Sequence, residues 1–359
     1  MKIITIVGAR PQFIKAAMVS RAIQAHNKEH SNQIEELLIH TGQHYDKAMS
    51  HIFFQEMNIP SPKWQLNCGN SSHGAMTGRM LEEIESILLT VKPDYVLVYG
   101  DTNSTLAGAL AASKLQIPVA HVEAGLRSFN KVMPEEINRI LTDHIASLLF
   151  CPTKNAVEHL RDENILSGVH HVGDVMYDAA LAFGKIAEQS SNILKLLELN
   201  EKQFRLCTVH RAENTDNRER LTGIFRALEE IAGSEYPVIL PLHPRTKGCL
   251  EKFGLTSKNP YLRFIPPISF LDMILLERHA ATILTDSGGV QKEAYFHQTP
   301  CITLRNETEW VETVTAGWNQ IAGYKQEAIL NCLASVPTQR KQIADYGTGH
   351  TAEKIISLL

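Results

Sequence analysis

The stretch "ATILTDSGGVQKEA", residues 281–294, passes from a buried strand into a helix through an acid, a hydroxyl and two glycines. Its first residues are mostly apolar or β-branched, which is typical of a strand buried in a parallel sheet. Asp286 and Ser287 are good helix caps, and Gly288 and Gly289 tolerate the tight turn. The same turn can seat a phosphate, because glycine leaves the amides at a helix start open to an anion. The stretch by itself leaves both interpretations open.

Apolar runs and amphipathic stretches alternate on both sides of this stretch, which predicts α/β architecture with parallel strands and crossover helices. A long helical stretch at 176–200 separates the two halves of this pattern, so we place a domain boundary there. The last residues, 351–359, predict a terminal helix. The strands are expected at 3–8, 36–41, 95–100, 119–124 and 148–153, and then at 205–210, 237–243, 262–267, 281–286 and 301–305.

Composition narrows the class of protein. The chain has 359 residues, 44% hydrophobic and 21% charged, which suits a globular protein of about two domains. A net charge of −4 offers no general attraction to nucleic acid or to acidic membranes, so we expect neither partner. No apolar run is long enough to cross a bilayer, and the start "MKIITIVGARP" predicts a first strand instead of a signal peptide. Six widely spaced cysteines without CxxC spacing predict reduced thiols in a cytoplasmic protein.

Polar residues follow most of the predicted strands directly. Ligands of open α/β sheets bind beyond the carboxyl ends of the strands, so these positions predict a cleft with one wall from each domain. The residues are Arg10, Gln43, His44, Asp101 and Glu123 in the first half, and His210, His243 and Asp286 in the second.

Several standard motifs are missing. The sequence contains no GxGxxG, GxxxxGK[ST] or HExxH, so we predict no standard dinucleotide, P-loop or zincin site. His40 and His44 have the spacing of helical metal ligands, but their segment reads as a strand and a turn. We therefore expect no metal site there.

Two cations follow the first strand. Arg10 stands between Gly8 and Pro11 at a helix start, where it could grip a phosphate with two hydrogen bonds or lie on the surface. Lys15 lies one helical turn further on and could add charge to the same site or face solvent.

Three carboxylates lie at predicted strand ends or at a helix start, where they are candidates for acid–base chemistry. Asp101 follows a strand and could serve only as a helix cap. Glu123 closes an apolar strand, where an unpaired carboxylate would have a raised pKa suited to proton transfer. Glu135 starts a helix after Pro134, where its charge could simply complement the helix dipole and pair with Arg139.

Two histidines end strands of the second half, His210 in "TVHRAEN" and His243 in "PLHPRT". One histidine among 16 is usually structural. Two at equivalent positions are better candidates for phosphate contact or acid–base work.

The motifs, in this order, resemble the non-hydrolysing UDP-N-acetylglucosamine 2-epimerase family. The resemblance covers essentially the whole chain, from "GARPQFIK", "HTGQH", "YGDTNSTLAG" and "HVEAGLRS" through "MPEEINR", "VHRAEN", "LTDSGGVQKEA" and "TEWVE" to "YGTG". It implies two Rossmann-like, doubly wound domains of the GT-B type, at 1–175 and 200–345. It also implies that a helix within 346–359 crosses back to the first domain, and that the protein is a homodimer without metal or nicotinamide cofactor.

Carried over position by position, the resemblance gives roles to many of these residues. Asp101, Glu123 and Glu135 match the catalytic carboxylates of the family, and we add His210 to the catalytic candidates. The substrate-binding candidates are Arg10, Lys15, Arg139, His243, Ser287, Gly288, Gly289, Glu293 and Arg305, with Glu293 as the ribose partner.

The chemistry fits these assignments. Carbon 2 of an N-acetylhexosamine is not next to a carbonyl, and the chain shows no hydride-carrier site, so elimination is the remaining route. UDP leaves, carbon 2 loses its proton, a bound glycal remains, and UDP adds back with protonation on the other face. This route needs stabilisation of the leaving diphosphate and acid–base groups around the sugar.

The chain departs from the usual family pattern at three places. "TEWVE" (308–312) replaces Thr-Glu-Arg-Pro-Glu, "HRAE" (210–213) replaces His-Arg-Arg-Glu, and the segment between "GLR" and "PEE" is two residues shorter. These features look closer to the branch acting on UDP-2,3-diacetamido-2,3-dideoxy-glucuronate, a precursor of lipopolysaccharide O-antigen. The carboxylate of that sugar would need a cation, for which Arg127, Lys131 and Arg211 are candidates.

Other functions stay open at this point. An allosteric second sugar-nucleotide site would use Gln43 and His243, although Asp46 stands where an uncharged partner is expected. A glycosyltransferase, a hydrolysing epimerase or a non-catalytic nucleotide-sugar sensor could share the architecture.

Overall fold

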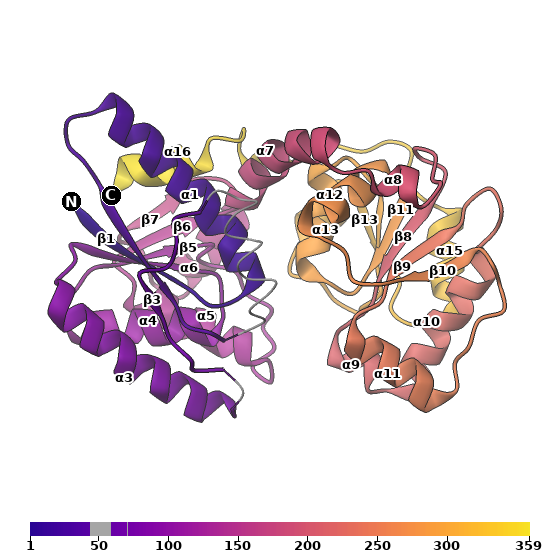
Figure 1. Cartoon of the computed structure of the whole chain (residues 1–359), viewed down its shortest axis with the longest axis horizontal. Helices are drawn as coiled ribbons and strands as arrows, with labels where there is room; N and C mark the ends of the chain where they lie inside the picture. The colour runs from indigo at the N-terminus through magenta and orange to yellow at the C-terminus, as the bar shows by residue number, and fades with distance from the viewer. Residues whose placement is uncertain (44–58, 70) are drawn as a thin grey trace. The chain divides into compact units, whose positions relative to one another are not determined.

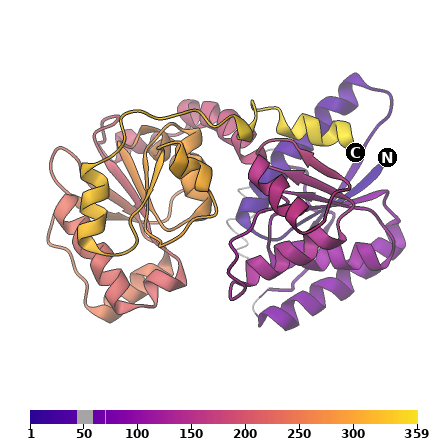
Figure 2. The ribbon, with the colours of Figure 1, turned by 180° about the vertical axis from the view of Figure 1, so that it is seen from behind.

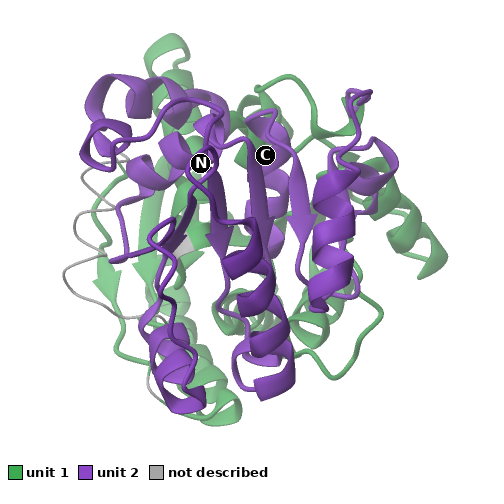
Figure 3. Ribbon diagram, turned by 90° about the vertical axis from the view of Figure 1, so that its right-hand side faces the viewer, with its two compact units in different colours: residues 1–179, 344–359 green, residues 180–343 purple. Residues whose placement is uncertain are grey.

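The computed structural model describes residues 1–43, 59–69 and 71–359, except for the side chain of Arg10. The chain divides into two compact units, which Figure 3 colours green and purple. Unit 1 comprises Met1–Ala179 and Ala344–Leu359, and unit 2 comprises Ala180–Ile343. The helix α7 (Val175–Ser190) contains the division between them.

Unit 1 is built on a seven-stranded parallel sheet in the order β3-β2-β1-β4-β5-β6-β7 (Figure 1). Residues of β1 after Lys2 are all buried, as expected for a strand with helices on both faces. The strands are β1 (Lys2–Val7), β2 (Glu35–His40), β3 (Trp64–Gln65), β4 (Tyr95–Tyr99), β5 (Val119–Val122), β6 (Leu148–Cys151) and β7 (Val169–His171).

Helices connect and cover these strands. The last helix of the chain packs against the first, so the two chain ends lie close together in Figures 1 and 2. The helices of unit 1 are α1 (Arg10–Glu29), α3 (His73–Val91), α4 (Asn103–Lys114), α5 (Pro134–Ile145), α6 (Lys154–Asp162) and α16 (Thr351–Leu358), with a 3-10 turn at Ala344–Tyr346.

Unit 2 repeats the design with a six-stranded parallel sheet in the order β10-β9-β8-β11-β12-β13. Its strands are β8 (Arg205–Thr208), β9 (Val238–Pro241), β10 (Leu262–Ile265), β11 (Thr282–Thr285), β12 (Cys301–Thr303) and β13 (Asn319–Ile321). Its helices are α8 (Ile193–Leu196), α9 (Ala212–Thr215), α10 (Arg218–Ile231), α11 (Pro244–Phe253), α12 (Phe270–His279), α13 (Gly288–Phe296), α14 (Val311–Thr315) and α15 (Gln326–Ala334).

Both strand orders are those of a Rossmann-like doubly wound sheet, and both reverse direction beside the first strand. The reversal falls between β1 and β4 in unit 1, and between β8 and β11 in unit 2. Such a point leaves a crevice beyond the carboxyl ends of the strands, because the flanking connections leave toward opposite faces. The residues after these four strands are therefore the ones that the fold presents to a ligand.

The prediction of two Rossmann-like α/β domains is confirmed, and all ten predicted strands form within two residues of the expected bounds. Three further strands, β3, β7 and β13, add an edge to their sheets. No helix in the described part of the chain is long and apolar enough to cross a membrane.

Candidate active site

Gln12 joins the two turns that meet at the reversal point of unit 1. Its Oε1 accepts hydrogen bonds from the amides of Gly8 (2.8 Å) and Ala9 (3.1 Å), at the end of β1. Its Nε2 donates to Tyr99 O (2.8 Å) and Thr105 Oγ1 (2.9 Å), at the end of β4. All four hydrogen bonds of the buried amide are used, so Gln12 fixes the floor of this crevice.

Glu123 and Lys15 form an ion pair at the same place. Lys15 Nζ lies 2.6 Å from Glu123 Oε1, and the side chains are only 8% and 13% exposed. The premise of an unpaired Glu123 is therefore wrong, because Lys15 supplies the compensating charge. Glu123 has φ +71°, a left-handed backbone that costs energy in any residue other than glycine.

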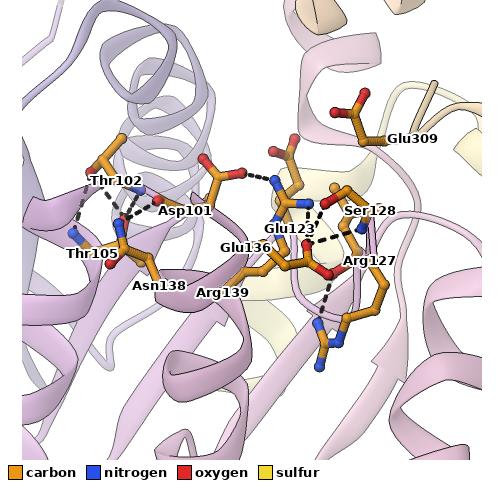
Figure 4. A network of polar contacts seen from close by, with 12 residues as sticks. Asp101, Thr102, Thr105, Glu123, Arg127, Ser128, Glu136, Asn138, Arg139 and Glu309 are labelled. Atoms are coloured by element: carbon orange, nitrogen blue, oxygen red, sulfur yellow. Dashed lines mark hydrogen bonds and ion pairs between the residues drawn. The ribbon is translucent and has the colours of Figure 1, made fainter. Parts of the chain in front are cut away.

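Asp101, Arg139 and Glu136 form a second network, shown in Figure 4. Arg139 donates from Nη2 to Asp101 Oδ2 and from Nη1 to Glu136 Oε2 (2.9 Å). Glu136 is 1% exposed and also accepts from the amides of Ser128 (2.9 Å) and Phe129 (2.8 Å). The buried carboxylate thus holds the loop after β5 and the arginine that faces Asp101.

Glu135 lies outside this network. It occupies the first turn of α5, is exposed, and has no hydrogen-bond or ion-pair partner among the described residues. The expected pair with Arg139 is therefore wrong, because that arginine turns to Asp101 and to Glu136. Asp101 also does not cap α4, since Thr102 is the cap and its hydroxyl accepts from the amide of Thr105.

Arg127 cannot serve as a partner for a sugar carboxylate. Its guanidinium is buried and donates to Glu163 through Nε (2.6 Å) and Nη2 (2.8 Å). Its Nη1 donates to Asp143 Oδ2 (2.7 Å) and to Leu126 O (2.6 Å). With every nitrogen engaged, Arg127 is a structural residue, while Lys131 is exposed in the neighbouring loop.

Gln43 is also engaged within unit 1. Its Oε1 accepts from the amide (3.0 Å) and the hydroxyl (2.8 Å) of Ser104, near the start of α4. His44 and Asp46 lie outside the described residues, as does the side chain of Arg10, whose backbone begins α1.

Asp286 organises the reversal point of unit 2. This fully buried carboxylate accepts from the amides of His210 (3.1 Å) and Arg211 (3.1 Å) and from Nδ2 of Asn214 (3.0 Å). The residue after β11 thereby holds the turn after β8. Asn214 also donates to Leu304 O (3.0 Å), which ties in the end of β12.

The start of α13 has the geometry of an anion seat. Ser287 caps the helix through its hydroxyl, and Gly288 and Gly289 form its first positions. A methyl group added to Gly288 would lie 3.6 Å from Trp310 Nε1, 3.7 Å from Arg211 Nη2 and 3.7 Å from Glu309 Oε2, which pairs with Arg305. Two side-chain donors therefore lie beside the start of the helix, as a phosphate would require, together with one carboxylate oxygen that Arg305 neutralises.

Both predicted histidines lie at the expected edge of the sheet of unit 2. The His210 side chain is 47% exposed, with Nδ1 3.5 Å from Asp286 Oδ1. Desolvation lowers the pKa of His210, the Asp286 charge opposes this, and the charge of Arg211 adds to it. His243 is exposed and caps α11, with Nδ1 accepting from the amide of Arg245 (3.2 Å).

Arg305 and Glu293 complete the predicted set. Arg305 is buried and makes a two-point ion pair with Glu309, at 2.8 and 3.0 Å. Burial raises the pKa of Glu309, but the hydrogen bond and charge of Arg305 outweigh this, and its pKa lies below the ordinary value. Glu293 is half-buried within α13.

The unusual "TEWVE" segment forms part of the α13 seat. Trp310 is buried, and Nζ of Lys292 lies 3.9 Å from the centre of its ring. Thr308 donates to Gln291 Oε1 (2.6 Å), which fastens the segment to α13. Ala212, the other departure, is exposed at the start of α9.

Sequence reasoning missed Gln12, Glu136 and Asp143, which hold the predicted residues in place. A group of three or more His, Cys, Asp or Glu side chains able to hold a metal ion is absent from residues 1–43, 59–69 and 71–359. The site residues described above provide acid–base groups in unit 1 and anion-binding groups in unit 2.

Two Rossmann-like units, each with polar groups beyond the carboxyl ends of its strands, define an α/β protein of the GT-B type. The sequence profile of the UDP-N-acetylglucosamine 2-epimerase family matches residues 26–359. The chain belongs to this family.

Individual relatives match over essentially their whole length. The chain is 54% identical to a UDP-N-acetylglucosamine 2-epimerase homolog of Methanococcus maripaludis, covering 100% of this chain and 99% of the relative. It is 50% identical, with the same coverage, to the UDP-2,3-diacetamido-2,3-dideoxy-D-glucuronate 2-epimerase of Pseudomonas aeruginosa. The crystal structure of Methanocaldococcus jannaschii UDP-GlcNAc 2-epimerase in complex with UDP-GlcNAc and UDP has a TM-score of 0.90 and 44% identity, covering 100% and 99% of the two chains.

Proposed function

We propose that this protein is a non-hydrolysing 2-epimerase of a UDP-N-acetylhexosamine-type sugar. The observation that carries the proposal is the pair Asp101 and Glu123, which follow the adjacent strands β4 and β5. Each carboxylate is joined to a largely buried cation, Arg139 or Lys15. Such carboxylates are held at defined positions, as proton transfer at a sugar carbon requires.

The reaction divides into two half-reactions. UDP leaves carbon 1 with the bonding electron pair, a carboxylate takes the proton of carbon 2, and a double bond forms between the two carbons. The return of UDP to carbon 1 and of a proton to the opposite face of carbon 2 completes the inversion. We assign the proton chemistry to Asp101, Glu123 and Glu135, and the diphosphate contacts to Arg10, His210, Ser287, Gly288 and Gly289.

The second network favours proton exchange at Asp101. Asp101 and Glu136 share one arginine, so two carboxylates face a single positive charge. Glu136 also receives two backbone amides, whereas the Asp101 carboxylate is partly exposed. Glu136 is held in place by four hydrogen bonds, so Asp101 is the carboxylate of this network that a substrate can reach, and we assign the proton transfer to it.

Two substrates fit the family: UDP-GlcNAc, converted to UDP-ManNAc, and UDP-2,3-diacetamido-glucuronate, converted to its manno epimer. Of the cations considered for a uronate, Lys131 and Arg211 retain that role, since Arg127 is fully engaged. The product would serve the synthesis of bacterial surface polysaccharide. We further propose a homodimer that uses no metal or nicotinamide cofactor, and a cytoplasmic location, which the six free cysteines support.

Deuterium exchange tests the function directly. The protein is incubated in deuterated water with UDP-GlcNAc, or with its diacetamido-uronate analogue, and followed by NMR. Deuterium at carbon 2 with the UDP linkage retained supports the proposal and identifies the sugar. Release of free sugar would show a hydrolysing epimerase, and no exchange with either sugar would overturn the assignment.

Variants connect the exchange to the site. We expect D101N, E123Q and E135Q each to remove exchange while UDP binding stays largely intact. E158Q, which changes an exposed glutamate on α6, is the matched control and should leave exchange unchanged. Normal turnover in all three site variants would contradict the catalytic assignment.

A further inference from the structure

His121 is a completely buried histidine beneath the acid–base groups of unit 1. It lies on β5, two residues before Glu123. Its Nδ1 lies 2.7 Å from Asp143 Oδ1, and its Nε2 lies 2.7 Å from Gly100 O. A carbonyl oxygen can only accept, and the Asp143 carboxylate already accepts from Gly125 N (3.1 Å) and from Arg127. Both ring nitrogens of His121 must then donate, which makes the ring an imidazolium.

The charges around the ring lead to the same protonation state. Asp143 and Glu163 carry two negative charges, and Arg127 pairs with both of them. Glu163 is 28% exposed and also lies 3.1 Å from His144 Nε2, so Asp143 is the fully buried carboxylate of the group, and a charged His121 gives it a second cation besides the one that Arg127 shares with Glu163. Burial raises the pKa of Asp143, but the hydrogen bond and charge of His121, followed by those of Arg127, outweigh this and lower it below its ordinary value.

The ring connects the backbone segments that carry the two central carboxylates. Gly100, whose carbonyl accepts from Nε2, immediately precedes Asp101. Gly125, whose amide donates to Asp143, comes two residues after Glu123. Gly100, Glu123 and Gly125 all have left-handed backbones, with φ of +62°, +71° and +78°. The two glycines adopt this conformation without strain, but Glu123 between them does not and needs surrounding contacts to fix it. His121 and Asp143 supply hydrogen bonds to Gly100 and Gly125, on both sides of Glu123 in this edge of the sheet.

We propose that His121, held as an imidazolium by Asp143, is a positioning residue that sets the backbone of Asp101 and Glu123 for proton transfer. The proposal rests on the proposed function, because it concerns how the same site works. His121 itself stays beneath the site and touches no substrate.

His40 provides an internal reference for the charge state. Its Nδ1 accepts a hydrogen bond from the amide of Gly42 (2.9 Å), so this nitrogen carries no proton. A ring ¹⁵N spectrum of the full-length protein should therefore show His121 with two protonated nitrogens and His40 with an unprotonated Nδ1. An unprotonated ring nitrogen on His121 at neutral pH would overturn the proposal, whatever the protein catalyses.

The H121Q variant tests positioning. Its amide can donate to only one of the two acceptors in this geometry, so we expect kcat and deuterium exchange to fall roughly 10- to 100-fold. UDP binding and KM should change less than about threefold, because His121 contacts none of the residues assigned to the diphosphate, most of which lie in unit 2. H170Q, on β7 of the same sheet, is the matched control with unchanged kcat. Unchanged kcat in H121Q, or an equal fall in kcat and UDP affinity, would contradict positioning.

D143N keeps the proposal testable if H121Q does not fold. This change removes the balancing charge while keeping the shape, so His121 should lose one ring proton and kcat should fall. A doubly protonated His121 with normal kcat in D143N would overturn the proposal. Absence of exchange in the unaltered protein would refute the proposed function and the positioning claim, while the ring spectrum would still decide the charge state.

Discussion

Lys15 Nζ lies 2.6 Å from Glu123 Oε1, and this ion pair joins α1 to the end of β5. The pair lies over Gly100: a methyl group there would be 3.4 Å from the ammonium and 3.6 Å from the carboxylate. Both distances are ordinary van der Waals contacts, but Gly100 has φ +62°, so a side chain there would be strained by its backbone. The end of β4 therefore has no side chain where the pair passes above it, next to Asp101.

Removing Lys15 should destabilise the protein as well as reduce its activity. K15M leaves the Glu123 carboxylate largely buried without its cation, and loss of one partner of such a pair costs about 3 kcal/mol. We expect this loss in the free energy of unfolding from urea titrations at neutral pH. The double variant K15M/E123Q should regain most of the stability while remaining inactive. Equal stabilities of K15M and the unaltered protein would show that the pair is solvated.

Gly8 has no room for a side chain. A methyl group at this position would lie 2.1 Å from Ser104 Oγ and 2.2 Å from Thr41 Oγ1, between two hydroxyls that are hydrogen-bonded at 2.8 Å. G8A should therefore cost about 1–3 kcal/mol of unfolding free energy. G248A, in the open interior of α11, should instead stabilise by about 0.5–1 kcal/mol. The midpoints of urea unfolding, compared at an unchanged dependence of the unfolding free energy on urea concentration, measure both changes in stability. A G8A variant as stable as the unaltered protein would contradict the predicted crowding.

A negative charge at the start of α13 should weaken UDP binding while it raises the stability of the fold. Gly289 is exposed, and a methyl group there meets only Ser287 Oγ at 3.8 Å. G289D places a carboxylate at the positive end of the helix, which should stabilise the fold by about 0.3–1 kcal/mol. The same charge repels a diphosphate, so UDP affinity should fall roughly 100-fold or more in calorimetry. G289A is the uncharged control, and unchanged UDP affinity in G289D would place the diphosphate elsewhere.

His297 should make stability fall in acid. Burial, with the charges of Arg278 and Lys202, lowers the pKa of His297 to about 3, from 6.5. Below pH 6.5 the unfolded chain binds a proton that the folded protein excludes. Stability should therefore fall by up to about 1.4 kcal/mol for each pH unit between the two values, and be unaffected by this group above them.

H297L removes this proton linkage. Urea unfolding at neutral and at mildly acidic pH should show a flatter loss of stability in H297L than in the unaltered protein. H30L changes an exposed histidine and should keep the original slope. Parallel slopes for H297L and the unaltered protein would show that His297 takes up its proton in the folded state.

The central strands could be predicted from the sequence, whereas three edge strands could not. Central strands of a parallel sheet are buried on both faces, which forces the apolar runs that identify them. The edge strands Trp64–Gln65, Val169–His171 and Asn319–Ile321 are two or three residues long and partly polar. Without a continuous apolar run, nothing in their composition separates them from loops.

Some residues of the candidate site could likewise be predicted from the sequence, and others could not. Asp101, Glu123, His210 and Ser287 follow central strands, so their positions at the sheet edge follow from the strand pattern. Glu136 and Asp143 could not be predicted from that pattern, because their burial depends on which face α5 turns inward.

One signal on α5 could have revealed them. Glu136, Arg139 and Asp143 recur at helical spacing and are buried, while Ile137 and Leu141 are 47% and 48% exposed. A helix with its charged face inward violates the usual amphipathic pattern, and such violations mark functional regions.

The left-handed backbone of Glu123 lowers the stability of the folded protein at this one position. Glycine or asparagine would relax this conformation, but neither can accept the proton of a sugar carbon. Aspartate would keep the acid and ease the backbone, yet its shorter side chain would withdraw the carboxylate from Lys15. Any substitution that relaxes this backbone therefore removes or shifts the carboxylate to which we assign proton transfer, so selection for stability alone would favour another residue at this position.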